Sequence, residues 1–128
     1  MIITKTPYRI SFFGGGSDYP VWYKKFGGSV LSTTIDKFIY ISCRDLPPFF
    51  DHKYRIVWSK IENVKVINQI QHTTVQKLLK YNKINSGLEI HYDGDLPARS
   101  GMGSSSSFSV GLMYALIKYQ KKTSLILI

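Results

Sequence analysis

A run of glycines and serines between a strand-like segment and an apolar helical segment constrains this chain most. Residues 101–107 read Gly-Met-Gly-Ser-Ser-Ser-Ser. Serine hydroxyls compete for backbone partners inside a helix, but they are favoured where a helix begins and its first amides lack partners. The two glycines allow backbone angles that other residues resist. The segment therefore predicts a turn that opens into a helix, with free N–H groups and the positive end of the helix dipole directed outward.

Such a turn is suited to bind an anion, and the chemistry that it suggests is phosphate binding. The alternative is a flexible linker, because Ser- and Gly-rich runs are often unstructured. The strand-like segment Leu88–Tyr92 before the run and the strongly apolar helix after it favour a phosphate loop. The chain has no Gly-Lys pair, which excludes a Walker-type lysine, and Ser106 stands where a dinucleotide fingerprint has its third glycine. The helix predicted after the serine run has an apolar stripe that consists of Phe108, Leu112, Ala115 or Leu116, and Tyr119.

The rest of the chain predicts strands in a run with intercalated helices. A short helix is expected after a cap at Ser17 or Asp18, with Pro20 in its first turn and Gly27-Gly28 at its end. Longer helices are expected from Asn68 to about Tyr81 and over about residues 104–120. This order is typical of an α+β, two-layer α/β sandwich in one domain. Strands are predicted over Ile2–Phe13, Ser29–Arg44, Tyr54–Ser59 (beside its predecessor) and Leu88–Tyr92.

Residues 97–106 resemble the signature of a known family. They read Pro-Ala-Arg-Ser-Gly-Met-Gly-Ser-Ser-Ser, and the GHMP small-molecule kinases (galactose, homoserine, mevalonate and phosphomevalonate kinases) carry Pro-x-x-x-Gly-Leu-Gly-Ser-Ser-Ala. Met102 takes the place of the leucine and Ser106 that of the alanine. The sequence of this segment is closer still to that of the heptose kinase branch, which phosphorylates D-glycero-D-manno-heptose 7-phosphate at C1.

Residues 6–19 resemble the first motif of the same family, and the resemblance as a whole extends over about residues 1–119. Gly15 and Gly16 replace a Glu and a His that recognise a hexose in galactokinases, which argues against galactose. A Gly-Gly-Gly-Ser/Thr-Asp version is what the heptose kinase branch shows. The positions that match the galactokinase pattern are Arg9, Gly14, Asp18 and Tyr19.

The resemblance implies an ATP-dependent sugar kinase that uses Mg²⁺ and has the family's N-terminal domain, of the ribosomal-protein-like domain 2 type. Its product would be a heptose 1,7-bisphosphate, a precursor for surface polysaccharides. The loop amides would cradle the ATP phosphates, and Ser105 aligns with a serine that helps to hold Mg²⁺. The residues implied in ATP binding are Pro97, Arg99, Ser100, Gly101, Met102, Gly103, Ser104, Ser105 and Ser106.

Two further roles are implied near the N-terminus. Asp18, with Gly15 and Gly16, would bind the sugar, because a carboxylate accepts two hydroxyl hydrogen bonds. Arg9 would supply positive charge beside the transferring phosphoryl group. The alternatives are structural: Ser105 and Asp18 as helix caps and Arg9 as a surface strand residue. Arg99 is equally well explained as a solvated loop arginine.

The resemblance also implies parts that these 128 residues do not supply. Family members use a carboxylate on a later helix as a second Mg²⁺ ligand, and many use a later aspartate as base. Residues 101–128 contain neither Asp nor Glu. We therefore expect residues 1–128 to be the N-terminal ATP-binding domain, truncated after the loop helix. The missing C-terminal half is the expected partner, and the chain alone is expected to be inactive.

The charge of the chain leaves a second class of function open. The formal net charge is +9, which would suit a basic nucleic-acid-binding module of the same fold. The lysines are scattered, however, and a positive field equally suits ATP and a sugar phosphate. Within the kinase class, another sugar such as fucose is the alternative substrate. A signal peptide and a membrane span are not expected, which favours the cytoplasm.

Single residues with chemical potential are expected to be structural. Cys43 lies in an apolar strand and predicts a buried small hydrophobe. The histidines at 52, 72 and 91 lack metal-ligand spacing. Asp93-Gly94-Asp95 predicts a turn rather than a cation site.

Overall fold

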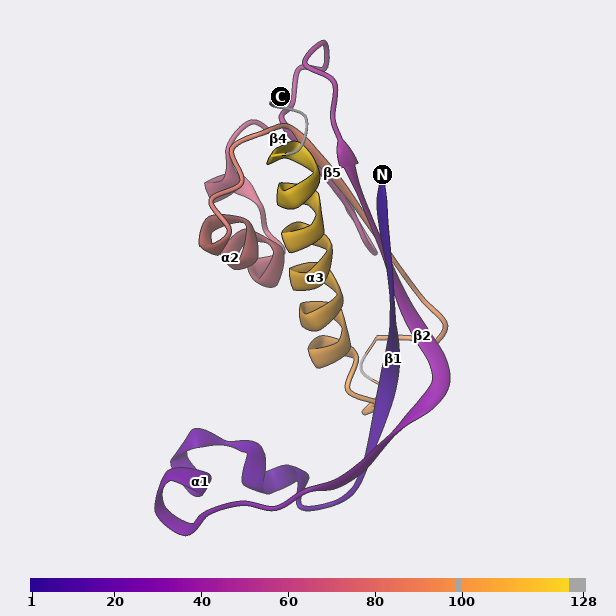
Figure 1. Ribbon diagram of the computed structural model, residues 1–128, viewed down its shortest axis with the longest axis vertical. Helices are drawn as coiled ribbons and strands as arrows, with labels where there is room; N and C mark the ends of the chain where they lie inside the picture. The colour runs from indigo at the N-terminus through magenta and orange to yellow at the C-terminus, as the bar shows by residue number, and fades with distance from the viewer. Residues whose placement is uncertain (99, 125–128) are drawn as a thin grey trace.

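The computed structural model describes residues 1–98 and 100–124 and shows a two-layer α+β fold (Figure 1). One layer is a mixed five-stranded sheet in the order β1-β2-β5-β3-β4, and the other contains α2 and α3. The predicted fold class is therefore confirmed. The strands are β1 (Ile2–Phe13), β2 (Leu31–Asp45), β3 (Tyr54–Val57), β4 (Ile61–Val64) and β5 (Leu88–Gly94). The helices are α1 (Pro20–Phe26), α2 (Thr73–Tyr81) and α3 (Ser104–Ser124), with 3-10 turns η1 (Gly15–Asp18) and η2 (Ile67–Gln69).

Strand pairing corrects one prediction. The strand that begins at Tyr54 does not lie beside its predecessor, because β2 is already paired antiparallel with β1 on one side and β5 on the other. Instead β3 pairs parallel with β5 and antiparallel with β4. A parallel partner requires a crossover connection, and β4, η2 and α2 supply it. The sequence analysis missed β4, whose four residues are too few for a periodic pattern.

Helix starts differ from the predicted ones. Tyr19, not Ser17 or Asp18, precedes α1, because η1 takes up both of those residues. Helix α2 begins at Thr73 instead of Asn68, and His72 caps it by accepting a hydrogen bond from Val75 N at Nδ1, over 3.4 Å. The long first strand and the helix after the serine run are confirmed.

The core lies between the sheet and α3, which packs on β1 and β2. All members of the predicted helical stripe are buried, from Phe108 to Tyr119. Cys43 is buried as predicted, and burial raises the pKa of its thiol to about 12, so the thiol is protonated and inert at neutral pH. Among the described helices, none combines the length and apolarity that a membrane crossing requires.

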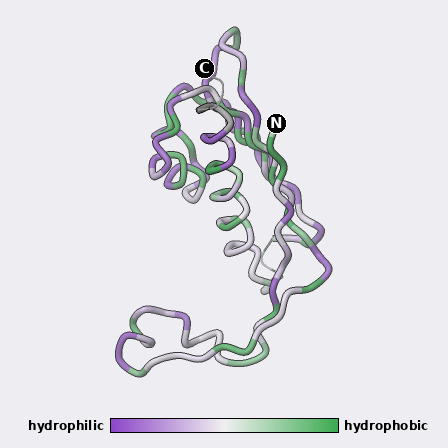
Figure 2. Tube along the Cα trace, in the orientation of Figure 1, coloured by the Kyte–Doolittle hydropathy of each residue, from purple (hydrophilic) through white to green (hydrophobic). Residues whose placement is uncertain are grey.

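Strands β1 and β2 extend beyond the rest of the sheet as a two-stranded ribbon, and η1 and α1 lie at its end (Figure 1). We call residues 12–34 the lobe. No residue from 12 to 34 is buried, although this lobe includes hydrophobic segments (Figure 2). Trp22 and Phe26 pack on each other, with ring centroids 4.8 Å apart. The lobe is therefore connected to the rest of the fold through the β1–β2 strand pair, and it contributes no buried residue to the core. Its exposed aromatic residues are Phe12, Phe13, Tyr19, Trp22, Tyr23 and Phe26.

Gly111 marks the closest approach of α3 to the sheet, and Gly111→Ala is expected to destabilise the fold by about 1–2 kcal/mol. A Cβ there would lie 2.6 Å from Thr6 Oγ1 and 3.3 Å from Ile41 Cδ1. The overpacking outweighs the gain in helix propensity of about 1 kcal/mol. Urea unfolding followed by circular dichroism measures the change. Val110→Ala on the exposed face of the same helix is the control, and an unchanged midpoint for Gly111→Ala would contradict this packing.

Candidate phosphate-binding site

The glycine–serine loop is fixed to the edge strand. Gly101 and Gly103 have φ angles of 74° and 71°, in the left-handed region that favours glycine. Met102 O accepts a hydrogen bond from Arg9 N over 3.0 Å. Ser107 Oγ donates to Pro7 O over 2.8 Å. The loop is therefore a rigid turn and not a linker.

The start of α3 presents its polar groups to solvent. Ser107 N donates to Gly103 O, so the amides of residues 104–106 precede the first intrahelical hydrogen bond. Ser105 and Ser106 are exposed and Ser104 is half-buried. The amides, the hydroxyls and the helix dipole together make this helix start a candidate anion-binding surface.

The remaining loop residues divide into exposed and inward-facing groups. Pro97 and Gly101 are exposed, whereas Met102 packs against the core. Ser100 Oγ is buried without a hydrogen-bond partner in the described part of the chain. A buried hydroxyl without a partner is costly, which makes it a candidate ligand contact. Arg99 lies outside the described residues.

Arg9 joins the two motifs that lie far apart in sequence. Its backbone N–H is bonded to the loop, and its guanidinium Nη2 lies 3.9 Å from Asp18 Oδ2 in η1. Both side chains are well exposed, 41% for Arg9 and 49% for Asp18, so the ion pair itself adds little stability. Arg9 Nε, by contrast, is buried and finds no partner within residues 1–98 and 100–124. Arg9 thus contacts the loop through its backbone and the turn that holds Asp18 through its guanidinium.

The glycines before Asp18 leave open space on that side. Gly14 turns the chain with φ 80°, and a Cβ there would lie 1.8 Å from Ser29 O. Gly15 and Gly16 are exposed, and a Cβ on Gly16 would meet nothing within 4 Å. The turn therefore presents bare backbone and one carboxylate to whatever binds beside Arg9.

An aromatic pocket adjoins the loop, and the sequence analysis missed it. It has a volume of about 240 Å³ and includes Ser104 and Ser105 in its wall. Four rings form a row, which we call the aromatic row: Trp58, His72, Phe108 and Tyr92. Successive ring centroids are 5.0, 4.9 and 5.2 Å apart. These residues come from four separate segments, so no spacing in the sequence could indicate the pocket.

The aromatic row is uncharged at neutral pH. Burial lowers the pKa of His72, against the opposing effects of its backbone hydrogen bond and of the Glu62 charge. Burial, a hydrogen bond with Tyr8 and nearby negative charge raise the pKa of Tyr92 to about 12. A neutral aromatic surface favours stacking with a flat ring system, while the adjoining helix start favours an anion.

The described residues do not assemble a metal site by themselves. Within them, no group of three or more His, Cys, Asp or Glu side chains converges. Ser105 offers one exposed hydroxyl at the helix start, a suitable oxygen ligand for Mg²⁺ alongside phosphate oxygens.

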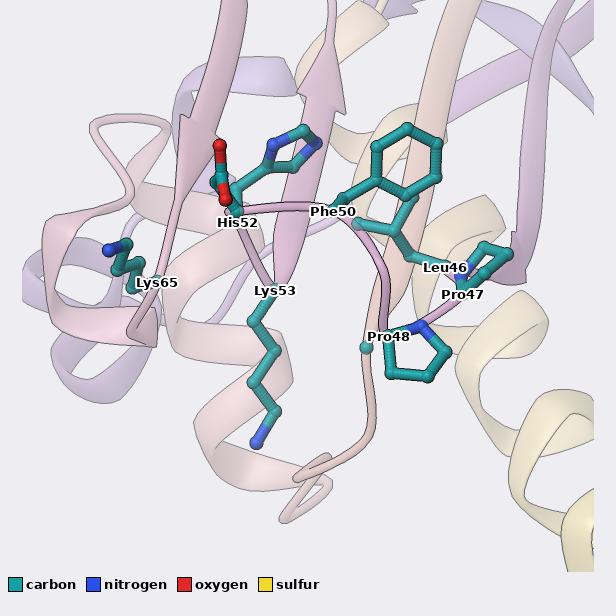
Figure 3. A pocket seen from close by; sticks show the side chains of 9 residues that line it. Leu46, Pro47, Pro48, Phe50, His52, Lys53 and Lys65 are labelled. Atoms are coloured by element: carbon teal, nitrogen blue, oxygen red, sulfur yellow. The ribbon is translucent and has the colours of Figure 1, made fainter.

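A second cavity of about 320 Å³ lies under the loop between β2 and β3, at the end of the molecule away from the phosphate loop (Figures 1 and 3). Its wall is largely apolar, from Leu46, Pro47, Pro48 and Phe50. The side chains of Lys53 and Lys65 point in different directions (Figure 3). The two lysine ammonium groups therefore do not converge on one point in this cavity.

Fold and site together define a class: an α+β domain with a glycine–serine loop at a helix start. Comparison with known proteins places the chain within that class. Residues 65–126 match the family model of the GHMP kinases N terminal domain. The chain carries a GHMP kinase N-terminal domain and is a distant homologue of the heptose phosphate kinases.

A curated relative supports the family and shows how much of it is present. The D-glycero-alpha-D-manno-heptose 7-phosphate kinase of Campylobacter jejuni is 28% identical over 92% of this chain. The chain spans 38% of the length of that relative.

Solved structures agree on the fold. A D-glycero-D-manno-heptose 1-phosphate kinase from Bacteroides thetaiotaomicron superposes with a TM-score of 0.79 at 20% identity, over 94% of this chain and 42% of that one. The mevalonate kinase of Methanococcus jannaschii gives 0.67 at 19% identity, over 93% and 40%. At such identities the likeness is one of fold.

Proposed function

We propose that this chain is the ATP-binding half of a sugar kinase that transfers the γ-phosphoryl group of ATP to a heptose phosphate such as D-glycero-D-manno-heptose 7-phosphate. The observation that carries the proposal is the position of Arg9 between the phosphate loop and Asp18. This arrangement would bring together a helix start that can bind an anion, a cation and a carboxylate that can accept hydrogen bonds from a sugar. The heptose 7-phosphate kinase at 28% identity supports the choice of sugar.

The residues present fit ATP. The triphosphate would lie on the loop amides. Ser100 Oγ and Arg9 Nε, which are buried and have no hydrogen-bond partner among residues 1–98 and 100–124, are further candidates to contact it. The base would enter the aromatic pocket, whose wall includes Ser104 and Ser105. Stacking on rings and hydrogen bonding to a helix start are the two interactions that a nucleotide needs.

Asp18 and Arg9 would act on the acceptor side. The Asp18 carboxylate can accept hydrogen bonds from two sugar hydroxyls, and Gly15 and Gly16 leave room for a ring. The Arg9 guanidinium would offset negative charge on the phosphoryl group during transfer. In the free protein the pair at 3.9 Å holds both side chains toward the same space.

Mg²⁺ would neutralise charge on the phosphates when bound, and Ser105 is the residue here that would ligate it. We propose that the other metal ligand, the base and the domain that closes the site belong to a C-terminal half. The chain spans 38% to 42% of the two heptose kinases described above.

Asp18→Asn is expected to weaken heptose 7-phosphate binding by about tenfold, because one charged acceptor is lost. ATP affinity should stay within about twofold, since Asp18 lies in η1 and its ion pair in the described part of the chain is with Arg9. Isothermal titration calorimetry with each ligand measures both. Asp36→Asn, an exposed aspartate on β2, is the matched control.

The same titrations separate the alternatives. Tighter binding of fucose than of heptose 7-phosphate would replace the substrate but keep the site. RNA binding with a steep salt dependence, together with no heat from ATP, would overturn the kinase proposal.

A further inference from the structure

A buried carboxylate is hydrogen-bonded to two residues of the aromatic row. Glu62 lies on β4 and is 7% exposed. Its Oε1 accepts hydrogen bonds from Trp58 Nε1 over 2.9 Å and from His72 N over 3.1 Å. Its Oε2 accepts a third from Gln71 N over 2.5 Å. Each of these bonds is charge-assisted and lies in a low-dielectric setting, so each is stronger than a neutral one in water.

This single side chain ties together two segments that the sheet alone does not join. Trp58 follows β3, and His72 caps α2. Their rings meet edge to face at 5.0 Å and form half of the aromatic row. Glu62 itself is not among the residues that line the pocket. It therefore acts on the pocket only through Trp58 and His72.

The protonation state of His72 fits this arrangement. Burial lowers the pKa of the ring, so the neutral form prevails at neutral pH. Because Nδ1 accepts the hydrogen bond from Val75 N, we assign the proton to Nε2. Glu62 thus holds His72 through its backbone N–H, and no ion pair between the two side chains is needed.

We propose that Glu62 is a positioning residue for the nucleotide base: it fixes Trp58 and His72 so that the aromatic row is preformed. The inference rests on the proposed function, because it takes the pocket to hold the base of ATP. It assigns affinity for the base to Glu62 and affinity for the phosphates to the loop. The two contributions can be measured apart with inorganic tripolyphosphate, which has no base.

The test is the affinity of Glu62→Gln for ATP and for tripolyphosphate, by calorimetry. Glutamine keeps the shape, but its amide group turns an N–H toward a backbone N–H donor. ATP affinity is expected to fall about tenfold, within the range that loss of base stacking produces. Tripolyphosphate affinity is expected to change by less than about twofold. Asn63→Ala, the exposed neighbour on β4, is the control.

Trp58→Phe is a second test of the proposal, and its result does not depend on whether the Glu62→Gln variant folds. It keeps an aromatic ring but removes the indole donor, so ATP affinity should fall while tripolyphosphate affinity is retained. In the double variant with Trp58→Phe, Glu62→Gln should lower ATP affinity by a smaller factor than it does alone, because the two residues act through one hydrogen bond.

The outcomes separate this inference from the proposed function. A wild-type chain that binds neither ligand overturns both. A wild-type chain that binds both ligands, with Glu62→Gln and Trp58→Phe losing neither or losing both equally, overturns the positioning role alone.

Discussion

Replacing Gly103 with valine is expected to lower ATP affinity by at least about 100-fold while the domain stays folded. The residue has φ 71° and lies against β1, with a Cβ position 3.5 Å from Arg9 Cβ. A branched side chain would strain this backbone by about 1–2 kcal/mol and shift the amides that follow it. Loss of two charge-assisted hydrogen bonds to phosphate, at about 1.5–3 kcal/mol each, accounts for that reduction at about 1.4 kcal/mol per tenfold.

Gly27→Val is the matched control for this experiment. Gly27 has φ 73° and ψ 179° and nothing within 4 Å of a Cβ, so a side chain there also strains the backbone, but in the lobe, away from the loop. Both variants should lose stability in urea, and only Gly103→Val should lose ATP affinity. Retained ATP affinity in Gly103→Val would refute the phosphate-loop assignment.

The 128-residue chain alone is expected to turn over ATP at least about a thousandfold more slowly than a full-length heptose kinase. Phosphoryl transfer depends on positioning and on charge stabilisation by metal ions, and removing a single electrostatic contributor costs about 10²–10³ in rate. Residues 101–128 contain no Asp or Glu. Carboxylates elsewhere already accept hydrogen bonds from the protein, as Glu62, Asp95 and Glu89 do.

The measurement is ATP consumption with heptose 7-phosphate, using the purified chain beside the Campylobacter jejuni kinase. Adding the remaining part of that kinase as a separate protein tests whether a C-terminal half restores turnover. A rate for the chain alone that equals the full-length rate would refute this expectation. Exposed carboxylates such as Asp36 would then have to take the missing roles.

The phosphate loop could be predicted from sequence because its signals are local. Positive φ angles favour glycine, and a helix start favours serine, so the geometry of residues 101–107 can be predicted from those residues themselves. The buried stripe of α3 follows from its helical period for the same reason. The mutual position of Arg9 and Asp18 could be expected only through the resemblance to a family.

The aromatic pocket could not be predicted, because it is a property of the assembled fold. Trp58, His72 and Tyr92 come together only after β3 pairs with β5 and α2 returns to the sheet. The short strand β4, which carries Glu62, has too few residues for a pattern. The sequence predicts His72 to be an ordinary histidine, and only its place between Trp58 and Phe108 distinguishes it.

We infer that the loop and the aromatic pocket form one nucleotide site, and amide chemical shifts during an ATP titration test this inference. In ¹⁵N spectra of the chain, we expect the amides of Gly101, Gly103 and residues 104–106 to shift together with the indole N–H of Trp58, along one binding curve. Tripolyphosphate should shift the signals of the loop amides and leave the signal of the Trp58 indole N–H unchanged. Shifts confined to residues outside the loop and the pocket, or loop and indole shifts with different affinities for ATP, would contradict it.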